Sequence, residues 1–209
     1  TIHLTGLAES GDSVSDDTSG DGDKLYLAIG ENEINIYGFE DIYLGADIGN
    51  ALTLSYLSGN LHGSAADDAI TLLDGSEVGH GSIDAGAGDD AITLEAANAQ
   101  YQQGEVVLVG YGLGTDSIAN FDDSDGIGVS GLSFLGYDFA DASTASAQSR
   151  QIGVTSGGGA TTLHLDANSD GTADTNVILT GGAYTASYYT IDANGHIAIK
   201  QDADSAIDW

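Results

Sequence analysis

Short runs of alternating apolar and polar residues recur along the first 120 residues, each with an apolar residue at its centre. Successive centres lie about nine positions apart, with longer steps around residues 74 to 81 and 96 to 104. Such alternation over about four to eight residues indicates a β-strand with one buried face. The pattern predicts strands centred on Leu25, Ile34, Ile42, Leu52, Leu61, Ile70, Ile83, Ile92, Val107 and Ile118.

The period of about nine residues has room for one short strand and one turn rich in Gly and Asp. Two such units make one coil of a parallel β-roll. Because a single coil cannot bury its own apolar face, neighbouring coils must stack. The alternative is a set of ordinary antiparallel strands with loosely regular spacing.

The pattern changes after about residue 120. The runs "TTLHL" and "NVILTG" predict two strands joined across residues 166 to 174, and residues 139 to 150 read as a short helix or a loop. Asn194-Gly195 lies between two alternating runs, which is a strong hairpin signal. We therefore expect an all-β fold: a parallel β-roll or β-solenoid with degenerate nonapeptide repeats in residues 1–120, then an antiparallel β-rich C-terminal cap in residues 121–209.

The chain is strongly acidic, with a formal net charge of -30 and only Lys24, Arg150 and Lys200 as basic residues. This composition argues against nucleic acid and anionic membrane surfaces as partners, since phosphate binding needs Lys and Arg. No apolar run is long enough for membrane insertion. Disorder and a halophile-type acidic surface are two general explanations of such acidity. Asp, however, outnumbers Glu 26 to 7 and clusters with Gly, Asn and Ser, which favours tight loops that wrap a hard cation.

Two segments match the nonapeptide G-G-x-G-x-D-x-U-x, in which U is a large apolar residue. "DAGAGDDAITL" places Gly86, Gly88 and Asp90 before the apolar Ile92, with Asp89 beside them. "YGLGTDSIA" supplies the same positions of a second repeat. Weaker matches have Ala66 in place of a glycine, Asn50 in place of the aspartate, or a shifted frame. The aspartates and glycines of these matches are Asp21, Asp23, Asp68, Gly86, Gly88, Asp89, Asp90, Gly112, Gly114 and Asp116.

This spacing suits a metal site between stacked turns. Glycines permit conformations that turn carbonyl oxygens inward, and the aspartate adds a charged oxygen. Turns from adjacent coils together can supply the roughly six to eight oxygens that Ca²⁺ takes. The ten residues are therefore predicted Ca²⁺ ligands, or turn glycines that shape the sites.

These motifs resemble the repeats-in-toxin (RTX) family of secreted bacterial proteins. The resemblance extends over roughly residues 19 to 120 and is sharp over residues 84 to 119. It implies a calcium-loaded β-roll, type I secretion and an extracellular or cell-surface location. Asn50 and Ala66 depart from the repeat in the earlier turns.

A second motif, "DANSDGTAD", opens like the calcium loop of an EF-hand. The flanking segments look like strands, so we expect a calcium loop in a β setting; a plain acidic turn is the alternative. The twelfth-position Glu of an EF-hand is replaced by Val177. The predicted ligands are Asp166, Asn168, Asp170, the carbonyl of Thr172, and Asp174.

Catalytic signatures are weak. The five histidines are scattered, and neither H-E-x-x-H nor G-x-S-x-G occurs. Pairs of acids carry little information in so acidic a chain. We therefore expect that this protein is not an enzyme.

The sequence favours an extracellular calcium-binding structural protein that folds and assembles on calcium, as in a surface layer, filament or biofilm matrix. Calcium ions and self-association, or a surface-associated partner, are the expected interactions. Alternatives are the C-terminal module of a secreted enzyme or adhesin, and a carbohydrate- or ice-binding solenoid. Thr53, Thr71 and Thr93 at equivalent positions are a short version of the threonine row that ice binding would use.

Overall fold

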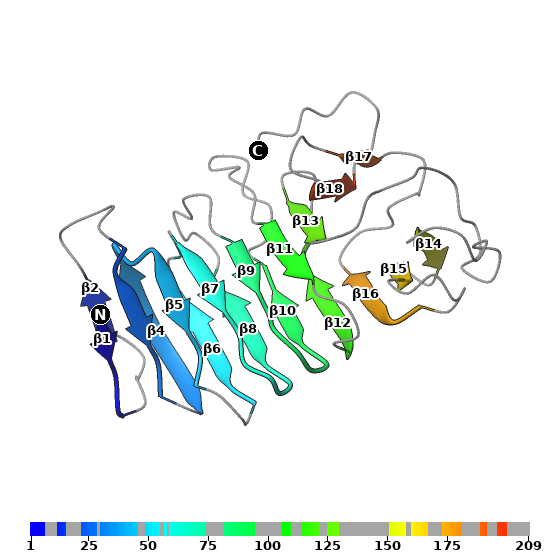
Figure 1. Cartoon of the computed structure of the whole chain (residues 1–209). Coiled ribbons are helices and arrows are strands. Elements are labelled where there is room, and N and C mark those ends of the chain that lie inside the picture. Colours follow the sequence, from blue (N-terminus) through cyan, green and yellow to red (C-terminus); the bar gives the residue numbers. More distant parts are fainter. Residues whose placement is uncertain are drawn as a thin grey trace.

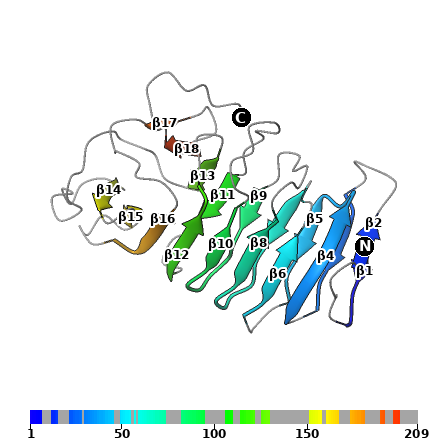
Figure 2. The ribbon, with the colours of Figure 1, turned by 180° about the vertical axis from the view of Figure 1, so that it is seen from behind.

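The computed structural model shows an all-β protein (Figures 1 and 2). It describes residues 1–6, 12–15, 22–28, 30–45, 49–54, 57, 59–73, 82–94, 106–109, 114–121, 125–129, 151–157, 160–166, 173–180, 189–191 and 196–199. No helix among these residues is long and apolar enough to cross a membrane.

The strands form two nine-stranded sheets, called here sheet A and sheet B. The order in sheet A is β1 (Ile2–His3), β3 (Lys24–Tyr26), β5 (Asp41–Tyr43), β7 (Asn60–His62), β9 (Ser82–Asp84), β11 (Val106–Val109), β13 (Gly126–Val129), β18 (His196–Ile199) and β17 (Tyr189–Ile191). The order in sheet B is β14 (Gln151–Gly157), β15 (Ala160–Asp166), β16 (Thr175–Thr180), β12 (Gly114–Ala119), β10 (Ala91–Thr93), β8 (Ala69–Leu72), β6 (Ala51–Leu54), β4 (Glu31–Tyr37) and β2 (Asp12–Ser15).

From β1 to β13 the chain alternates between the two sheets, so that each coil adds one strand to each. All neighbours from β1 to β13 in sheet A and from β2 to β12 in sheet B are parallel. The predicted parallel solenoid is therefore confirmed, and the antiparallel alternative is wrong for this part of the chain. The two predicted insertions, near residues 74 to 81 and 96 to 104, lie outside the described residues.

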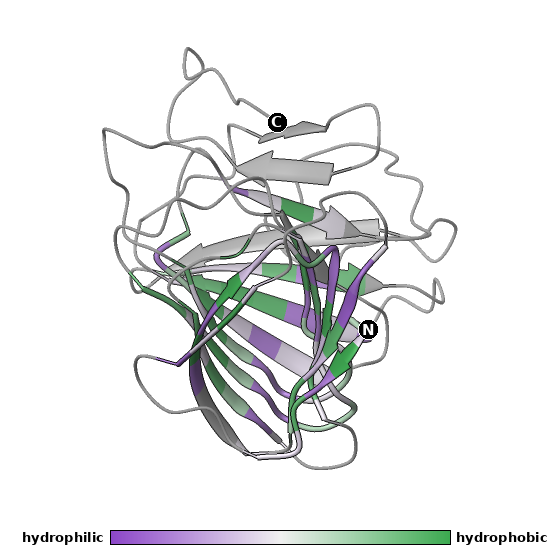
Figure 3. Cartoon of the chain, turned by 90° about the vertical axis from the view of Figure 1, so that its left-hand side faces the viewer, coloured by the Kyte–Doolittle hydropathy of each residue, from purple (hydrophilic) through white to green (hydrophobic). Residues whose placement is uncertain are grey.

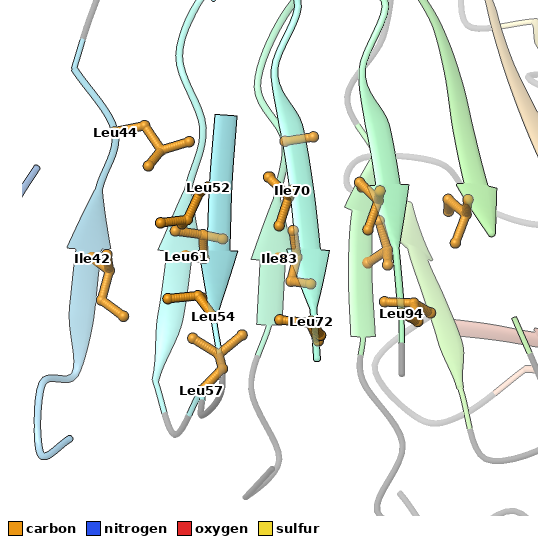
Figure 4. Packing of buried hydrophobic residues seen from close by; sticks show 14 of the residues in the cluster. Ile42, Leu44, Leu52, Leu54, Leu57, Leu61, Ile70, Leu72, Ile83 and Leu94 are labelled. Atoms are coloured by element: carbon orange, nitrogen blue, oxygen red, sulfur yellow. The ribbon is translucent and has the colours of Figure 1, made fainter. Parts of the chain in front are cut away.

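The core lies between the sheets. Within the coils, apolar residues of equivalent position stack in register, such as Leu52 on Ile70 and Ile70 on Ile92. All ten predicted strand centres are at most 3 % exposed. Figure 4 shows Leu and Ile side chains of both sheets in the space between them, and Figure 3 shows apolar and polar segments alternating along the strands. This packing buries apolar surface that a single coil would leave open to water.

Antiparallel pairing begins at the C-terminal end. Strand β16 stacks in parallel on β12, and β15 and β14 then continue sheet B in antiparallel order. In sheet A, β18 pairs antiparallel with both β13 and β17. The predicted strand pair around residues 166 to 174 and the C-terminal hairpin are confirmed. Residues 139 to 150 lie outside the described residues, and the domain boundary placed near residue 120 stays a prediction.

Candidate functional site

One position repeats at the entrance to the strands of sheet B, at the lower edge of the solenoid in Figure 1. The strand register makes Gly30, Asn50, Asp68, Asp90 and Asp116 equivalent. The backbone N–H of Asn50 donates to Oδ1 of Asp68, and the N–H of Asp68 donates to Oδ1 of Asp90, both at 2.7 Å. At 3.2 Å, the N–H of Gly30 donates to Asn50 Oδ1, and that of Asp90 to Asp116 Oδ1. We call the side chains of Asn50, Asp68, Asp90 and Asp116 the inner ladder.

The turn geometry explains why side-chain oxygens are needed at this position. The carbonyls of Asn50 and Asp68 accept from the next coil in the usual way, from Ala69 and Ala91 respectively. The N–H groups at the same position donate to the next coil's side chain instead. Because a buried N–H without an acceptor costs free energy, an Asn or Asp in the next coil completes the pairing. The inner-ladder side chains are 2 to 7 % exposed.

Asp68 is surrounded by donors. Its Oδ1 accepts from the backbone N–H of Asn50 at 2.7 Å and from the side-chain Nδ2 of Asn50 at 2.9 Å. Its Oδ2 accepts from the N–H of Ser64 in its own turn at 2.6 Å. Three donors therefore stabilise this buried carboxylate.

Asp90 lacks this support. Its Oδ1 accepts from Asp68, while its Oδ2 is buried with no hydrogen-bond partner. The residue that precedes Asp90 in the ladder is Asp68, which has no side-chain amide, so this step has no equivalent of the Asn50 Nδ2 donor. The position equivalent to Ser64 is Gly86, which also has a backbone N–H, but its φ is 96° and it donates no hydrogen bond to Asp90 Oδ2.

Asp90 and Asp116, at the C-terminal end of the ladder, have raised pKa values. Burial raises the pKa of Asp90 to about 7, and the neighbouring charges of Asp116, Asp68 and Asp67 act in the same direction. Burial, together with the charge of Asp89, raises the pKa of Asp116 to about 6. In both cases one backbone N–H opposes the shift. The ladder at β10 and β12 therefore favours a proton or a cation near neutral pH.

A second row of acids, the outer ladder, runs along the exposed side of the same turns. The N–H of Asp89 donates to Asp67 Oδ1 at 2.9 Å, and the N–H of Thr115 donates to Asp89 Oδ1 at 2.8 Å. The outer carboxylates thus accept from the following coil, and the inner ones from the preceding coil. The adjacent Asp89 and Asp90 therefore link their coil in both directions.

The turn glycines allow the coils to approach closely. Gly86, Gly88 and Gly114 all have positive φ, as their predicted role requires. A Cβ on Gly114 would lie 2.0 Å from the carbonyl oxygen of Gly88 and 2.7 Å from Asp89 Oδ1. Any side chain at Gly114 would therefore push two coils apart at the outer ladder.

The unpaired oxygen of Asp90 fits a cation, because it is a hard anionic donor that nothing else neutralises. Among the described residues, no three side chains of His, Cys, Asp or Glu gather closely enough to hold a metal on their own. Backbone carbonyls of the turns would therefore have to supply most of the oxygens, as the nonapeptide motif predicts. Asp90 and Asp116 would supply the carboxylates.

Other predicted ligands lie elsewhere. Asp23 precedes β3 in sheet A, where it contacts the N-terminal ammonium at 3.2 Å and its N–H donates to Glu40 at 2.8 Å. The structure does not bring it to the inner ladder. Asp166 ends β15, with only its backbone described, and the N–H of Asp174 donates to the carbonyl of Leu165 at 2.8 Å. The remaining predicted ligands, Asp21, Gly112, Asn168, Asp170 and Thr172, lie outside the described residues.

An aromatic row on sheet A was not anticipated from the sequence. His3, Tyr26, Tyr43 and His62 stack with ring centroids 4.5, 4.8 and 4.6 Å apart. Beside the row, Asp41 contacts His62 Nε2 at 3.2 Å, and its pKa is lowered, first by this hydrogen bond. Only the strand register aligns these residues, since their separations along the chain differ.

The chain was compared with protein-family models, curated proteins and solved structures, and no match was found in any of the three.

Proposed function

We propose that this chain is an extracellular structural protein whose solenoid is completed by Ca²⁺, bound between the turns that carry Asp90 and Asp116. The observation that carries the proposal is the buried Asp90 Oδ2, which has no donor although it stands in a stack of acids. A carboxylate in that position needs a proton or a cation. In a chain of net charge -30, a divalent ion also reduces the repulsion between coils.

Calcium is the cation that this chemistry favours. Hard oxygen donors, a flexible glycine backbone and the absence of cysteine suit Ca²⁺ better than softer metals. Extracellular modules bind Ca²⁺ at about 10⁻⁴–10⁻³ M. A chain with such affinity would fold on export, which agrees with the secretion that the RTX resemblance implies.

The test is a titration of the full chain with CaCl₂ after treatment with EGTA. We expect heat of binding in isothermal titration calorimetry, a gain of far-UV β signal and a rise in Tm. Mg²⁺ at the same concentration is the control for ionic strength and charge screening. No binding heat, together with a Tm that EGTA leaves unchanged, would overturn the proposal.

Assembly and catalysis are separate questions. Light scattering with and without Ca²⁺ should show ordered oligomers if the chain forms a layer or filament, whereas a persistent monomer favours a module of a larger secreted protein. We expect no enzymatic activity in either case.

One observation favours a second candidate function, ice binding. Thr53, Thr71 and Thr93 stand in register on three adjacent strands of sheet B, beside the equally aligned alanines Ala51, Ala69 and Ala91. Thermal hysteresis in the calcium-loaded chain tests this candidate, and Thr71→Lys should abolish the hysteresis if the row contacts ice.

A further inference from the structure

The inner ladder is supported unevenly from one end to the other. Among the described residues, Asp68 receives three donors, whereas the side chain of Asp90 receives one, the backbone N–H of Asp68. The difference begins at Asn50, which is the one amide in the ladder. Asn50 Oδ1 accepts from the N–H of Gly30 at 3.2 Å, while its Nδ2 donates to Asp68 Oδ1 at 2.9 Å.

An aspartate at position 50 would preserve half of this arrangement. It would still accept the N–H of Gly30, because the acceptor oxygen is common to Asn and Asp. It would lose the Nδ2 donor and place a second buried negative charge against Asp68. Two such carboxylates in contact repel each other unless a proton or a cation lies between them.

We infer that the Asn50 amide takes the place of a cation at the first step of the ladder, so that Asp68 needs no ion and cation binding is confined to Asp90 and the coils that follow it. This inference rests on the proposed function, since it assigns the limit of the same site. The amide also donates to the carbonyl of Gly45 at 3.0 Å. Its orientation is thus fixed by three partners, Gly30, Gly45 and Asp68.

The arrangement assigns different roles to the two ends of the solenoid. The step from Asn50 to Asp68 is complete with protein groups alone, so it can form before any ion is bound. The step at Asp90 depends on an ion. Residue 50 departs from the nonapeptide because its amide replaces the ion at this step. The departure is therefore not the loss of a former calcium site.

The experiment compares Asn50→Asp with the wild type by calcium calorimetry and by thermal unfolding in EGTA. We expect Asn50→Asp to bind one additional Ca²⁺ per chain, to have a lower Tm than the wild type in EGTA, and to recover that loss in millimolar Ca²⁺. The matched control is Asn60→Asp. Asn60 Nδ2 also donates to a carboxylate, Asp41 Oδ1 at 3.3 Å, but Asn60 is exposed. The control should bind the wild-type number of ions and keep its Tm in EGTA within a few degrees.

The double variant Asn50→Asp/Asp68→Asn separates an added site from added charge. It retains one amide and one carboxylate at this step, so it should bind the wild-type number of ions. The inference is overturned if Asn50→Asp binds no additional ion, or if it remains unfolded in millimolar Ca²⁺. It is also overturned if Asn50→Asp is as stable as Asn60→Asp in EGTA. A wild-type chain that binds no Ca²⁺ is a different outcome: it refutes the proposed function itself.

Discussion

The backbone N–H of Asp68 donates to Oδ1 of Asp90 at 2.7 Å, so the side chain of one coil supplies the acceptor that the preceding coil's backbone requires. A buried carboxylate, which would destabilise a core if it had no partner, thus becomes part of the hydrogen-bonded framework. The second oxygen, Oδ2, remains without a partner. The inner ladder therefore links neighbouring coils by hydrogen bonds, and it also makes the stability of the fold depend on a proton or a cation.

Without a cation, we expect stability to fall as the pH rises from 5 to 8. The pKa values of Asp90 and Asp116 are raised in the folded chain, to about 7 and about 6, above the ordinary aspartate value of 3.8. Between pH 3.8 and the raised pKa values, the folded state therefore binds more protons than the unfolded state. The stability that these bound protons contribute is lost as the pH rises through the folded pKa values. The loss should be roughly 2–4 kcal/mol, measured by urea unfolding in EGTA. A stability that rises from pH 5 to 8 would contradict the raised pKa values.

Removing the Asp90 charge should reduce the dependence of stability on pH and on calcium. In EGTA at pH 8, Asp90→Asn should be more stable than the wild type by about 1–2 kcal/mol, because an unpaired charge costs more than an unpaired amide. At pH 5 the two should be nearly equal, and Ca²⁺ should raise the Tm of the variant less. Asp12→Asn, at an exposed acid of β2, is the control and should retain the calcium response. Equal calcium responses in Asp90→Asn and the wild type would exclude Asp90 as a ligand.

The sequence predicts the strands and the position of the inner ladder because both depend on local patterns. Alternation places Ile70 and Ile92 inside, and an Asp two residues before each of them then faces the same side. The unequal support of Asp68 and Asp90 was not predictable in this way. It arises from Asn50 and Ser64, whose contacts with Asp68 become visible only when the register is known.

Longer-range relationships were also missed for a physical reason. His3, Tyr26, Tyr43 and His62 belong to coils of unequal length, so no fixed period connects them in the chain. The hydrogen-bond partner of Asp89 was missed for the same reason. The sequence predicts Asp89 as a Ca²⁺ ligand but does not reveal that its Oδ1 accepts from the backbone N–H of Thr115 in the next coil.

Gly114→Ala should disrupt the stacking of β10 and β12. The new Cβ would meet the Gly88 carbonyl oxygen at 2.0 Å, and φ at this position is 122°. We expect a loss of more than about 2 kcal/mol in the free energy of unfolding. Gly22→Ala isolates the backbone strain, since φ is 82° with nothing within 4 Å of the Cβ, and should cost about 1–2 kcal/mol. Gly6→Ala has open space and no positive φ, and should change stability by less than about 0.5 kcal/mol. Equal effects at the three positions would refute the close approach of the coils.

The stacked tyrosines of sheet A should couple energetically. Tyr26 and Tyr43 lie with ring centroids 4.8 Å apart and planes 13° from parallel, and Lys24 Nζ donates to the hydroxyl of Tyr43 at 3.2 Å. Aromatic pairs of this kind contribute about 0.5–1.5 kcal/mol beyond the area that they bury. A double-mutant cycle of Tyr26→Ala and Tyr43→Ala, measured by urea unfolding, should therefore give a coupling energy of about 1 kcal/mol.

Two controls define what the coupling measures. Tyr43→Phe removes only the hydroxyl, so in a cycle with Tyr26→Ala it should retain the ring contact and show little coupling. Tyr37 lies on sheet B and is 43 % exposed, and its replacement by Ala should add independently to that of Tyr43. Because the row connects coils on the sheet opposite the inner ladder, its coupling should persist in EGTA at pH 5, where Asp90 and Asp116 are largely protonated. Strict additivity of Tyr26→Ala and Tyr43→Ala under those conditions would show that the ring contact adds nothing to the stacking of the coils.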